Sequence, residues 1–430
     1  MKKYINIFIL LLFVSSFSFS QSESELYSKL KTIKEISSIE VIKADTTFKE
    51  AYEIMFEQPF DHQNLGGPKF KQRIFLSHLD FTKPVVFINE GYAANRNYKS
   101  ELSRIIESNQ IIVEHRYFGK STLGVDDWQY LTTKQSSDDH YAIINALKKI
   151  YNGKWISTGI SKGGQTSIFL KYYHPDAVDV SVPYVAPLNL SQEDPRIYEF
   201  FYNVGDEECR SKVTQFQRTA LQRRDEILPM IKEYSSEKKY TYSIGLDFAY
   251  EYAVLEYAFS FWQWYNDGCN KIPAPDAPAK EYYENMKSLM DYVSDQSQNY
   301  FAPFMYQAYT EVGYYGYELG QFSDVLKFLK GDIVSSCIFF PNGCELKFNN
   351  ELMPKVNQFI QEKGNNMLYI YGELDAWSST AVEIGSKTNA VKMVKKGGSH
   401  RTRINSFSDE EKENIFNTLE NWLDIKINRN

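Results

Sequence analysis

Residues 154–167 read KWISTGISKGGQTS and predict the turn around which the fold is built. A short β-type run from Trp155 meets the pattern Gly-x-Ser-x-Gly, and a helical pattern then runs to the breaker Pro175. Glycines at 159 and 163 allow a strained strand-to-helix turn that raises the hydroxyl of Ser161 above a sheet. The first free N–H groups of the helix then point at a developing oxyanion. We predict that Ser161 is a nucleophile, the alternative being an ordinary glycine-rich turn.

Strand and helix patterns alternate on both sides of this turn. Continuously apolar runs suit parallel strands that are buried on both faces, and such alternation is typical of α/β proteins. Residues 52–60 and 70–76 predict an antiparallel edge, and residues 21–45 predict a polar helical arm. The predicted parallel strands are residues 84–89, 110–114, 155–158, 178–182, 367–372 and 390–394.

The segment 191–345 follows a different pattern. Strand signals are few, and aromatic residues recur at helical spacing, as at Tyr252, Phe259 and Trp262. The acidic residues among them exclude a membrane span. We predict a helical cap that is inserted over the carboxyl ends of the parallel strands, where ligands bind. The predicted organisation is a signal peptide over residues 1–20, a sheet domain over residues 21–190 and 346–430, and the cap over residues 191–345.

The N-terminus has the three regions of a secretory signal peptide. Lys2 and Lys3 precede an apolar run over residues 5–14, and a cleavage site is expected after Ser20. The run is too short to span a bilayer, and no cysteine follows it to carry a lipid. We expect a secreted or periplasmic protein without stable membrane association. Loss of the two lysines changes the formal charge from −7 to −9, and an acidic chain without a basic block argues against nucleic acid as a partner.

The chain has four cysteines. In an exported protein an even number of cysteines favours disulfides, and no Cys-x-x-Cys pattern supports zinc. The short spacing of Cys337 and Cys344 predicts one bridge, which leaves Cys209 and Cys269 for a second. Three pairings are formally possible.

A nucleophilic serine needs a base, and the base needs an orienting carboxylate. In α/β-hydrolases these residues follow the chain order serine, acid, histidine, each at the carboxyl end of a strand. Ser161, Asp375 and His400 meet this order, and Glu373 is the alternative acid. The chain has only 6 histidines, and His400 is the one that follows a predicted late strand. We therefore predict an α/β-hydrolase fold with a Ser161–Asp375–His400 triad.

Two backbone N–H groups are expected to form the oxyanion hole. One belongs to Lys162, and the second comes from the loop at Gly91 and Tyr92. The side chain of Lys162 is expected to be solvated or ion-paired. Residues 114–121 read EHRYFGKS, but Glu114 stands where a phosphate-binding loop needs glycine. Arg116 in this stretch is expected to pair with a buried carboxylate.

Four motifs together resemble the secreted bacterial tripeptidyl aminopeptidases, a family distantly related to the lysosomal prolyl carboxypeptidase group. The motifs are EGY at 90–92, EHRYFGKS at 114–121, GISKGG at 159–164 and QAYTEVGY at 307–314. The likeness covers the chain from about residue 50 to its end, and it implies the same triad roles for Ser161, Asp375 and His400. Tyr309 stands where the prolyl carboxypeptidase relatives have a cysteine, so their cap disulfides are not transferred.

The resemblance implies a serine exopeptidase that releases short peptides, above all tripeptides, from peptide N-termini through an acyl-enzyme. The residues alone also allow a secreted carboxylesterase or lipase, or a non-catalytic ligand-binding protein on the same fold. Neither a metal nor a cofactor is expected. An aminopeptidase must bind a free α-ammonium group, which in a water-poor cleft needs a carboxylate partner. We expect Glu90 or Glu311 to supply it, although a structural ion pair is the alternative for each.

Overall fold

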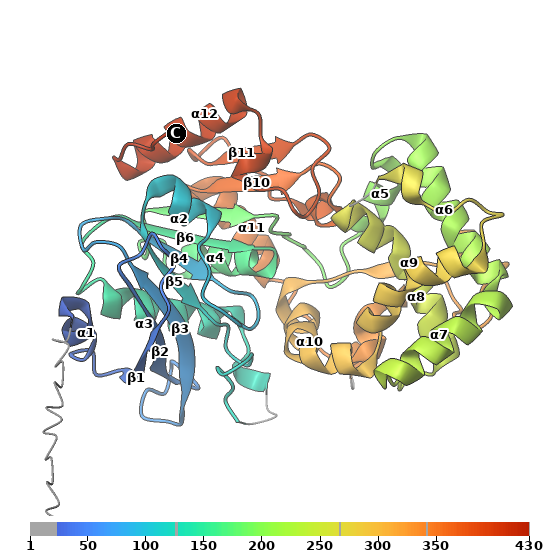
Figure 1. Cartoon of the computed structure of the whole chain (residues 1–430), viewed down its shortest axis with the longest axis horizontal. Coiled ribbons are helices and arrows are strands. Elements are labelled where there is room, and N and C mark those ends of the chain that lie inside the picture. The colour runs from blue at the N-terminus through green and yellow to red at the C-terminus, as the bar shows by residue number, and fades with distance from the viewer. Residues whose placement is uncertain (1–23, 125–127, 266–267, 341–342, 430) are drawn as a thin grey trace, which may run out of the picture.

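The computed structural model describes residues 24–124, 128–265, 268–340 and 343–429. The expected signal peptide over residues 1–20 lies outside the described residues. Nine strands form one sheet in the order β1-β2-β3-β5-β4-β6-β7-β10-β11 (Figure 1). Its strands are β1 (Ile36–Ile42), β2 (Glu50–Pro59), β3 (Lys69–His78), β4 (Val85–Asn89), β5 (Asn109–Val113), β6 (Trp155–Ile160), β7 (Val180–Tyr184), β10 (Leu368–Gly372) and β11 (Val391–Lys395).

The sheet has an antiparallel edge and a parallel body, as predicted. Strands β1, β2, β3 and β5 pair antiparallel in that order, and the pairs from β5 to β11 are parallel. The expected helical arm over residues 21–45 is wrong, because only α1 (Glu25–Leu30) is helical and β1 follows it. β-branched residues such as Ile36 and Ile39 favour a strand, and the intervening polar residues are tolerated because β1 is an edge strand with an exposed face.

Helices cover both faces of the sheet. Val85 and Phe87 of β4 join the core under α3, whereas Val86 and Ile88 of the same strand join the core under α2 and α12. This alternation is the period of two that a strand imposes. The helices of the sheet domain after α1 are α2 (Glu101–Ile106), α3 (Thr133–Leu147), α4 (Lys162–Tyr173), α11 (Leu352–Lys363) and α12 (Asp409–Leu423).

The cap lies beside the sheet and is mainly helical, to the right in Figure 1. A small two-stranded sheet joins β8 (Gly316–Glu318) to β9 (Ile333–Ser335). The predicted disulfides are confirmed, since Cys209 is bonded to Cys269 and Cys337 to Cys344. Within the described ranges, no helix combines the length and apolarity that a membrane crossing needs. The cap helices are α5 (Arg196–Asn203), α6 (Glu207–Gln222), α7 (Arg224–Lys238), α8 (Leu246–Trp264), α9 (Ala279–Tyr292) and α10 (Asp295–Gln307).

Candidate active site

Ser161 stands between β6 and α4 in a backbone conformation that side chains rarely adopt. Its φ is 57° and its ψ is −122°, and its N–H donates a 2.9 Å hydrogen bond to the carbonyl oxygen of Tyr184. A Cβ atom at Gly159 would lie 2.2 Å from the carbonyl oxygen of Gly163, and one at Gly163 would lie 2.4 Å from that of Asn89. Both glycines are therefore required by close backbone approach, and the turn has the strand-to-helix geometry of the predicted elbow, while the role of Ser161 as a nucleophile stays a prediction.

Asp375 and His400 lie together at the carboxyl ends of β10 and β11. Nδ1 of His400 lies 2.7 Å from Oδ2 of Asp375, and the N–H of Trp377 donates to Oδ1 of the same carboxylate at 3.1 Å. Burial raises the pKa of Asp375, and His400 opposes that shift. Because an ionised carboxylate only accepts, Nδ1 carries the proton and Nε2 is free to act as a base.

The alternative acid, Glu373, is turned away from the histidine. It is exposed, and its Oε2 accepts a 2.8 Å hydrogen bond from the N–H of Gly397. The structure thus pairs His400 with Asp375. Ser161 and His400 line the same cavity, and the triad formed by these two residues with Asp375 stays a prediction.

The cap holds the histidine loop, which sequence reasoning did not foresee. The backbone N–H of His400 donates a 2.9 Å hydrogen bond to the carbonyl oxygen of Gln263 in α8. The ring of Trp264 meets the ring of His400 edge to face, with centroids 5.5 Å apart. The last turn of α8 therefore contributes to the position of the candidate base.

The two expected oxyanion donors come from segments in direct contact. Lys162 is the first residue of α4, where backbone N–H groups have no partner within the helix. A Cβ atom at Gly91 would lie 2.6 Å from the Cβ of Lys162, so the loop that carries Tyr92 touches the start of α4. Tyr92 and Lys162 both line the cavity. This placement supports the predicted pair of N–H donors, whose role stays a prediction.

The expectation of a solvated or ion-paired Lys162 side chain is wrong. The residue is buried, and Nζ donates a 2.8 Å hydrogen bond to the carbonyl oxygen of Gly91. It also lies 5.6 to 6.0 Å from the ring centroids of Tyr92, Phe118 and Phe304. Desolvation lowers the pKa of Lys162 to about 7, against the opposing charge of Glu311. Rings from both domains cover this lysine, which no local pattern in the sequence could predict.

The two acids expected to bind substrate lie in different places. Glu90 lines the cavity and accepts a 3.0 Å hydrogen bond from the hydroxyl of Tyr98, and burial raises its pKa. Glu311 is absent from the residues that line the cavity, and its carboxylate instead accepts a 2.6 Å hydrogen bond from the N–H of Thr133 at the start of α3. A helix start offers unpaired N–H groups to an acid, so the placement of Glu311 in the cleft is corrected.

Arg116 pairs with a buried carboxylate, as predicted. Its Nε and one terminal nitrogen donate to the two oxygens of Asp139 at 2.7 and 2.8 Å. Both side chains are fully buried, and Asp139 also contacts His62. The motif at 114–121 therefore serves the structure beside the site and not phosphate binding.

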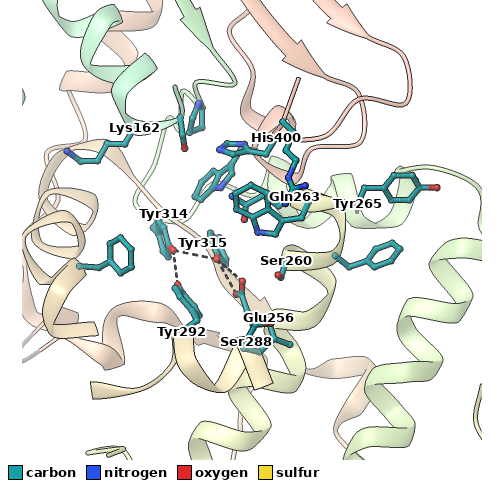
Figure 2. Close-up of a pocket in the computed structure, with 18 of the residues that line it drawn as sticks. Lys162, Glu256, Ser260, Gln263, Tyr265, Ser288, Tyr292, Tyr314, Tyr315 and His400 are labelled. Atoms are coloured by element: carbon teal, nitrogen blue, oxygen red, sulfur yellow. Dashed lines mark hydrogen bonds between the residues drawn. The ribbon is translucent and has the colours of Figure 1, made fainter. Parts of the chain in front are cut away.

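Sheet domain and cap together line a cavity of about 880 Å³. Glu90, Ser161 and His400 come from the sheet domain, and the cap side is lined mainly by α8, α9, α10 and the segment that carries Tyr314 and Tyr315. Figure 2 shows a group of tyrosines from the cap in this cavity, with Glu256 of α8 among them. Glu256 is one of three acids in this aromatic helical stretch, with Asp247 and Glu251, and no local signal in the sequence separates it from the other two.

A comparison with known proteins gives a family match over nearly the whole chain. The model of the PS-10 peptidase S37 family matches residues 22–428. The prolyl tri/tetrapeptidyl aminopeptidase of Streptomyces mobaraensis is 32% identical over 380 residues, which are 86% of this chain and 79% of that protein. A putative serine protease of Caenorhabditis elegans is 27% identical over 114 residues, 24% of this chain and 22% of that protein.

Solved structures resemble the fold more weakly. The proline iminopeptidase of Mycobacterium smegmatis matches 85% of this chain and 96% of its own, with 13% identity and a TM-score of 0.40. The family match favours neither the esterase or lipase alternative nor a non-catalytic binding protein. With its α/β-hydrolase fold, the chain belongs to the PS-10 peptidase S37 family and is a serine peptidase.

Proposed function

We propose that this serine peptidase is an exported exopeptidase that releases short peptides, chiefly tripeptides, from the N-termini of its substrates. The observation that carries the proposal is the cavity, in which the nucleophile faces a wall of cap helices. A chain end fits such a space, whereas an endopeptidase needs room for chain on both sides of the cleaved bond. The name of the Streptomyces relative, a tri/tetrapeptidyl aminopeptidase, supports the same product.

The proposed chemistry uses five groups. Ser161 attacks the scissile carbonyl while Nε2 of His400 accepts its proton, and Asp375 orients the imidazole. The N–H groups of Lys162 and Tyr92 stabilise the oxyanion. His400 then returns the proton to the leaving amine, which departs with the rest of the substrate. Water, activated by His400, hydrolyses the acyl-enzyme and frees the N-terminal peptide.

Export is the less direct part of the proposal. Two disulfides support it, because disulfides persist in oxidising compartments. The signal-peptide pattern over residues 1–20 points the same way. N-terminal sequencing of the mature protein from the medium or periplasm should begin at Gln21.

Product analysis tests the proposed activity. The wild-type enzyme is incubated with peptides of ten residues that have a free N-terminus, and the products are identified by mass spectrometry. We expect tripeptides released in succession, and Ser161→Ala should release none and lose fluorophosphonate labelling while keeping its Tm. Internal cleavage, or turnover of esters without peptides, would overturn the proposal.

A further inference from the structure

Glu256 differs from the other buried acids of the protein. Each of the other five acids in the described ranges with less than 9% exposure has a cationic or histidine partner within 4.0 Å, whereas Glu256, which is 5% exposed, has none. An isolated buried carboxylate is costly and takes up a proton unless a cation pairs with it, so an unpaired acid that faces a cavity is a candidate partner for a ligand cation. The five paired acids and their partners are Glu114 with Arg73, Asp139 with Arg116, Asp194 with Arg196, Glu251 with Arg224 and Asp375 with His400.

Among the residues that the structure describes, only phenol hydroxyls donate hydrogen bonds to the carboxylate of Glu256. Oε2 accepts hydrogen bonds from Tyr315, at 3.1 Å, and from Tyr317. The hydroxyl of Tyr314 in turn lies 2.9 Å from that of Tyr292 and 3.5 Å from that of Tyr315. These neutral donors fix the orientation of the carboxylate without neutralising it, so an incoming cation would meet a preorganised partner.

Glu256 also lines the cavity in which we propose that the substrate binds. It lines the cavity that holds Ser161 and His400, and Figure 2 shows it across the pocket from His400, with Tyr315 between them. Trp377, two residues after Asp375, packs against Tyr315 with ring centroids 5.3 Å apart. The tyrosine group is thus in contact with the loop of the triad acid while Glu256 lies beyond it.

We propose that Glu256 binds the α-ammonium group of the peptide substrate, so that the tyrosine-lined end of the cavity is the subsite for the substrate's N-terminus. This assignment rests on the proposed aminopeptidase function. Three extended residues span about 10 Å, which requires the ammonium site to lie away from the nucleophile. Glu256 stands in the cap wall, whereas Glu90 precedes Gly91, which touches Lys162 beside the nucleophile.

The electrostatics of the empty subsite agree with this role. Desolvation raises the pKa of Glu256 to about 8, although the hydrogen bonds from Tyr317 and Tyr315 oppose the shift. An ammonium group at hydrogen-bond distance favours the ionised carboxylate, so binding of the cation and ionisation of Glu256 support each other. An acetylated N-terminus has no charge to offer and gains nothing from the subsite.

The test compares a proline-ending tripeptide p-nitroanilide with its N-acetylated copy. For the wild-type enzyme we expect kcat/KM to be far higher with the free N-terminus. Glu256→Gln should lower kcat/KM for the free substrate roughly a hundredfold, mainly through KM, and leave the acetylated substrate unaffected. The rate of fluorophosphonate labelling of Ser161 should not change, which shows that the fold and nucleophile are intact.

Three further variants keep the outcome interpretable. Glu251→Gln removes another buried acid of α8 that does not line the cavity, and it should keep the preference for the free N-terminus even if its Tm falls. Tyr315→Phe removes one donor to Glu256 and should reduce the preference by a smaller factor, which preserves the test if Glu256→Gln does not fold.

A preference that survives in Glu256→Gln but disappears in Glu90→Gln would overturn the assignment of Glu256 and leave the proposed function in place. Equal wild-type rates for both substrates would instead overturn the proposed function.

Discussion

The backbone N–H of His400 donates a 2.9 Å hydrogen bond to the carbonyl oxygen of Gln263, so a residue of the candidate triad is attached to the cap. Gln263 and Trp264 form the last turn of α8, and Trp264 also lies under the guanidinium of Arg401. Both the sheet domain and the cap therefore determine the position of the loop that carries His400. Displacement of the cap would also displace the base.

Removal of the Trp264 ring should slow turnover. Trp264→Ala takes away the edge-on contact with His400, and a small misplacement of a catalytic group lowers kcat by roughly ten- to a hundredfold. Trp264→Phe keeps an aromatic edge and should retain most activity. Steady-state kinetics and the labelling rate of Ser161 measure the effect, and a Trp264→Ala enzyme with wild-type kcat would show that the contact does not position the base.

Substitution of the two acids after β10 should have sharply different effects on kcat. Asp375→Asn cannot hold the imidazole in the required tautomer, and kcat should fall roughly 10⁴-fold. Glu373→Gln alters an exposed residue bonded to a backbone N–H and should leave kcat within about twofold of wild type. Matched kcat measurements on folded variants decide, and a larger loss for Glu373→Gln would reassign the acid.

The buried side chain of Lys162 should support the oxyanion loop. Lys162→Met keeps the apolar stem and removes the donor to the carbonyl oxygen of Gly91, so we expect kcat to fall roughly tenfold with little change in KM. Lys171→Met is the matched control, because this lysine of α4 bonds the carbonyl oxygens of Pro175 and Val178 and does not line the cavity. A loss of kcat shared by both variants would mean general damage to α4.

The two disulfides should contribute unequally to stability. The Cys209–Cys269 bridge closes a separation of 60 residues and the Cys337–Cys344 bridge one of 7. Loop-closure entropy gives about 4 kcal/mol for the first and about 2 kcal/mol for the second. Denaturant unfolding of paired Cys→Ser variants tests this order. An equal loss of unfolding free energy in the two variants would mean that chain entropy is not the main source of stabilisation.

The preference for a free N-terminus should depend on pH in both directions. Glu256, with a pKa raised by desolvation to about 8, is protonated in the empty site at lower pH, so the ratio of kcat/KM for free and acetylated substrates should rise with pH toward about 8. Above that, the α-amino group, with a pKa of about 7.7 to 8.0, loses its charge and the ratio should fall.

The neighbouring tyrosines do not disturb this profile. Burial raises the pKa values of Tyr292, Tyr314, Tyr315 and Tyr317 well above their usual range, so these groups stay neutral throughout. The ratio cancels any pH dependence of the catalytic step itself, which both substrates share. A ratio that stays flat from pH 6 to 8 in the wild-type enzyme would contradict the role of Glu256.

Local patterns carried the prediction of the sheet and the candidate triad. The elbow at Ser161 is encoded by two glycines at fixed spacing, and the strand-end positions of Asp375 and His400 follow from runs of apolar residues. The disulfides followed from the number and spacing of the cysteines. Each of these signals lies within a few residues of the feature that it predicts.

The missed features depend on contacts between distant segments. Lys162 is buried because Phe304 of the cap covers it. Glu311 does not line the cavity, because its carboxylate accepts a hydrogen bond from the N–H of Thr133 at the start of α3. Glu256 gains its significance only where β8 and the preceding residues bring Tyr315 and Tyr317 to it. The periodicity of a helical pattern does not indicate which other segment of the chain the helix packs against.

The second half of helix α8 leads from Glu256 to the turn that contacts His400, so this helix can set the distance between the two groups. If the acid fixes one end of the substrate and the triad cuts at the other, the number of residues released is set by where along the helix the acid stands. Ser260 also lines the cavity, one turn closer to His400, and four residues of helix advance about 6 Å. Moving the acid to that position would shorten the measured span by between one and two residues of extended peptide. Product length in this enzyme is then set by the position of the acid along α8, and a shift of one helical turn changes it by more than one residue.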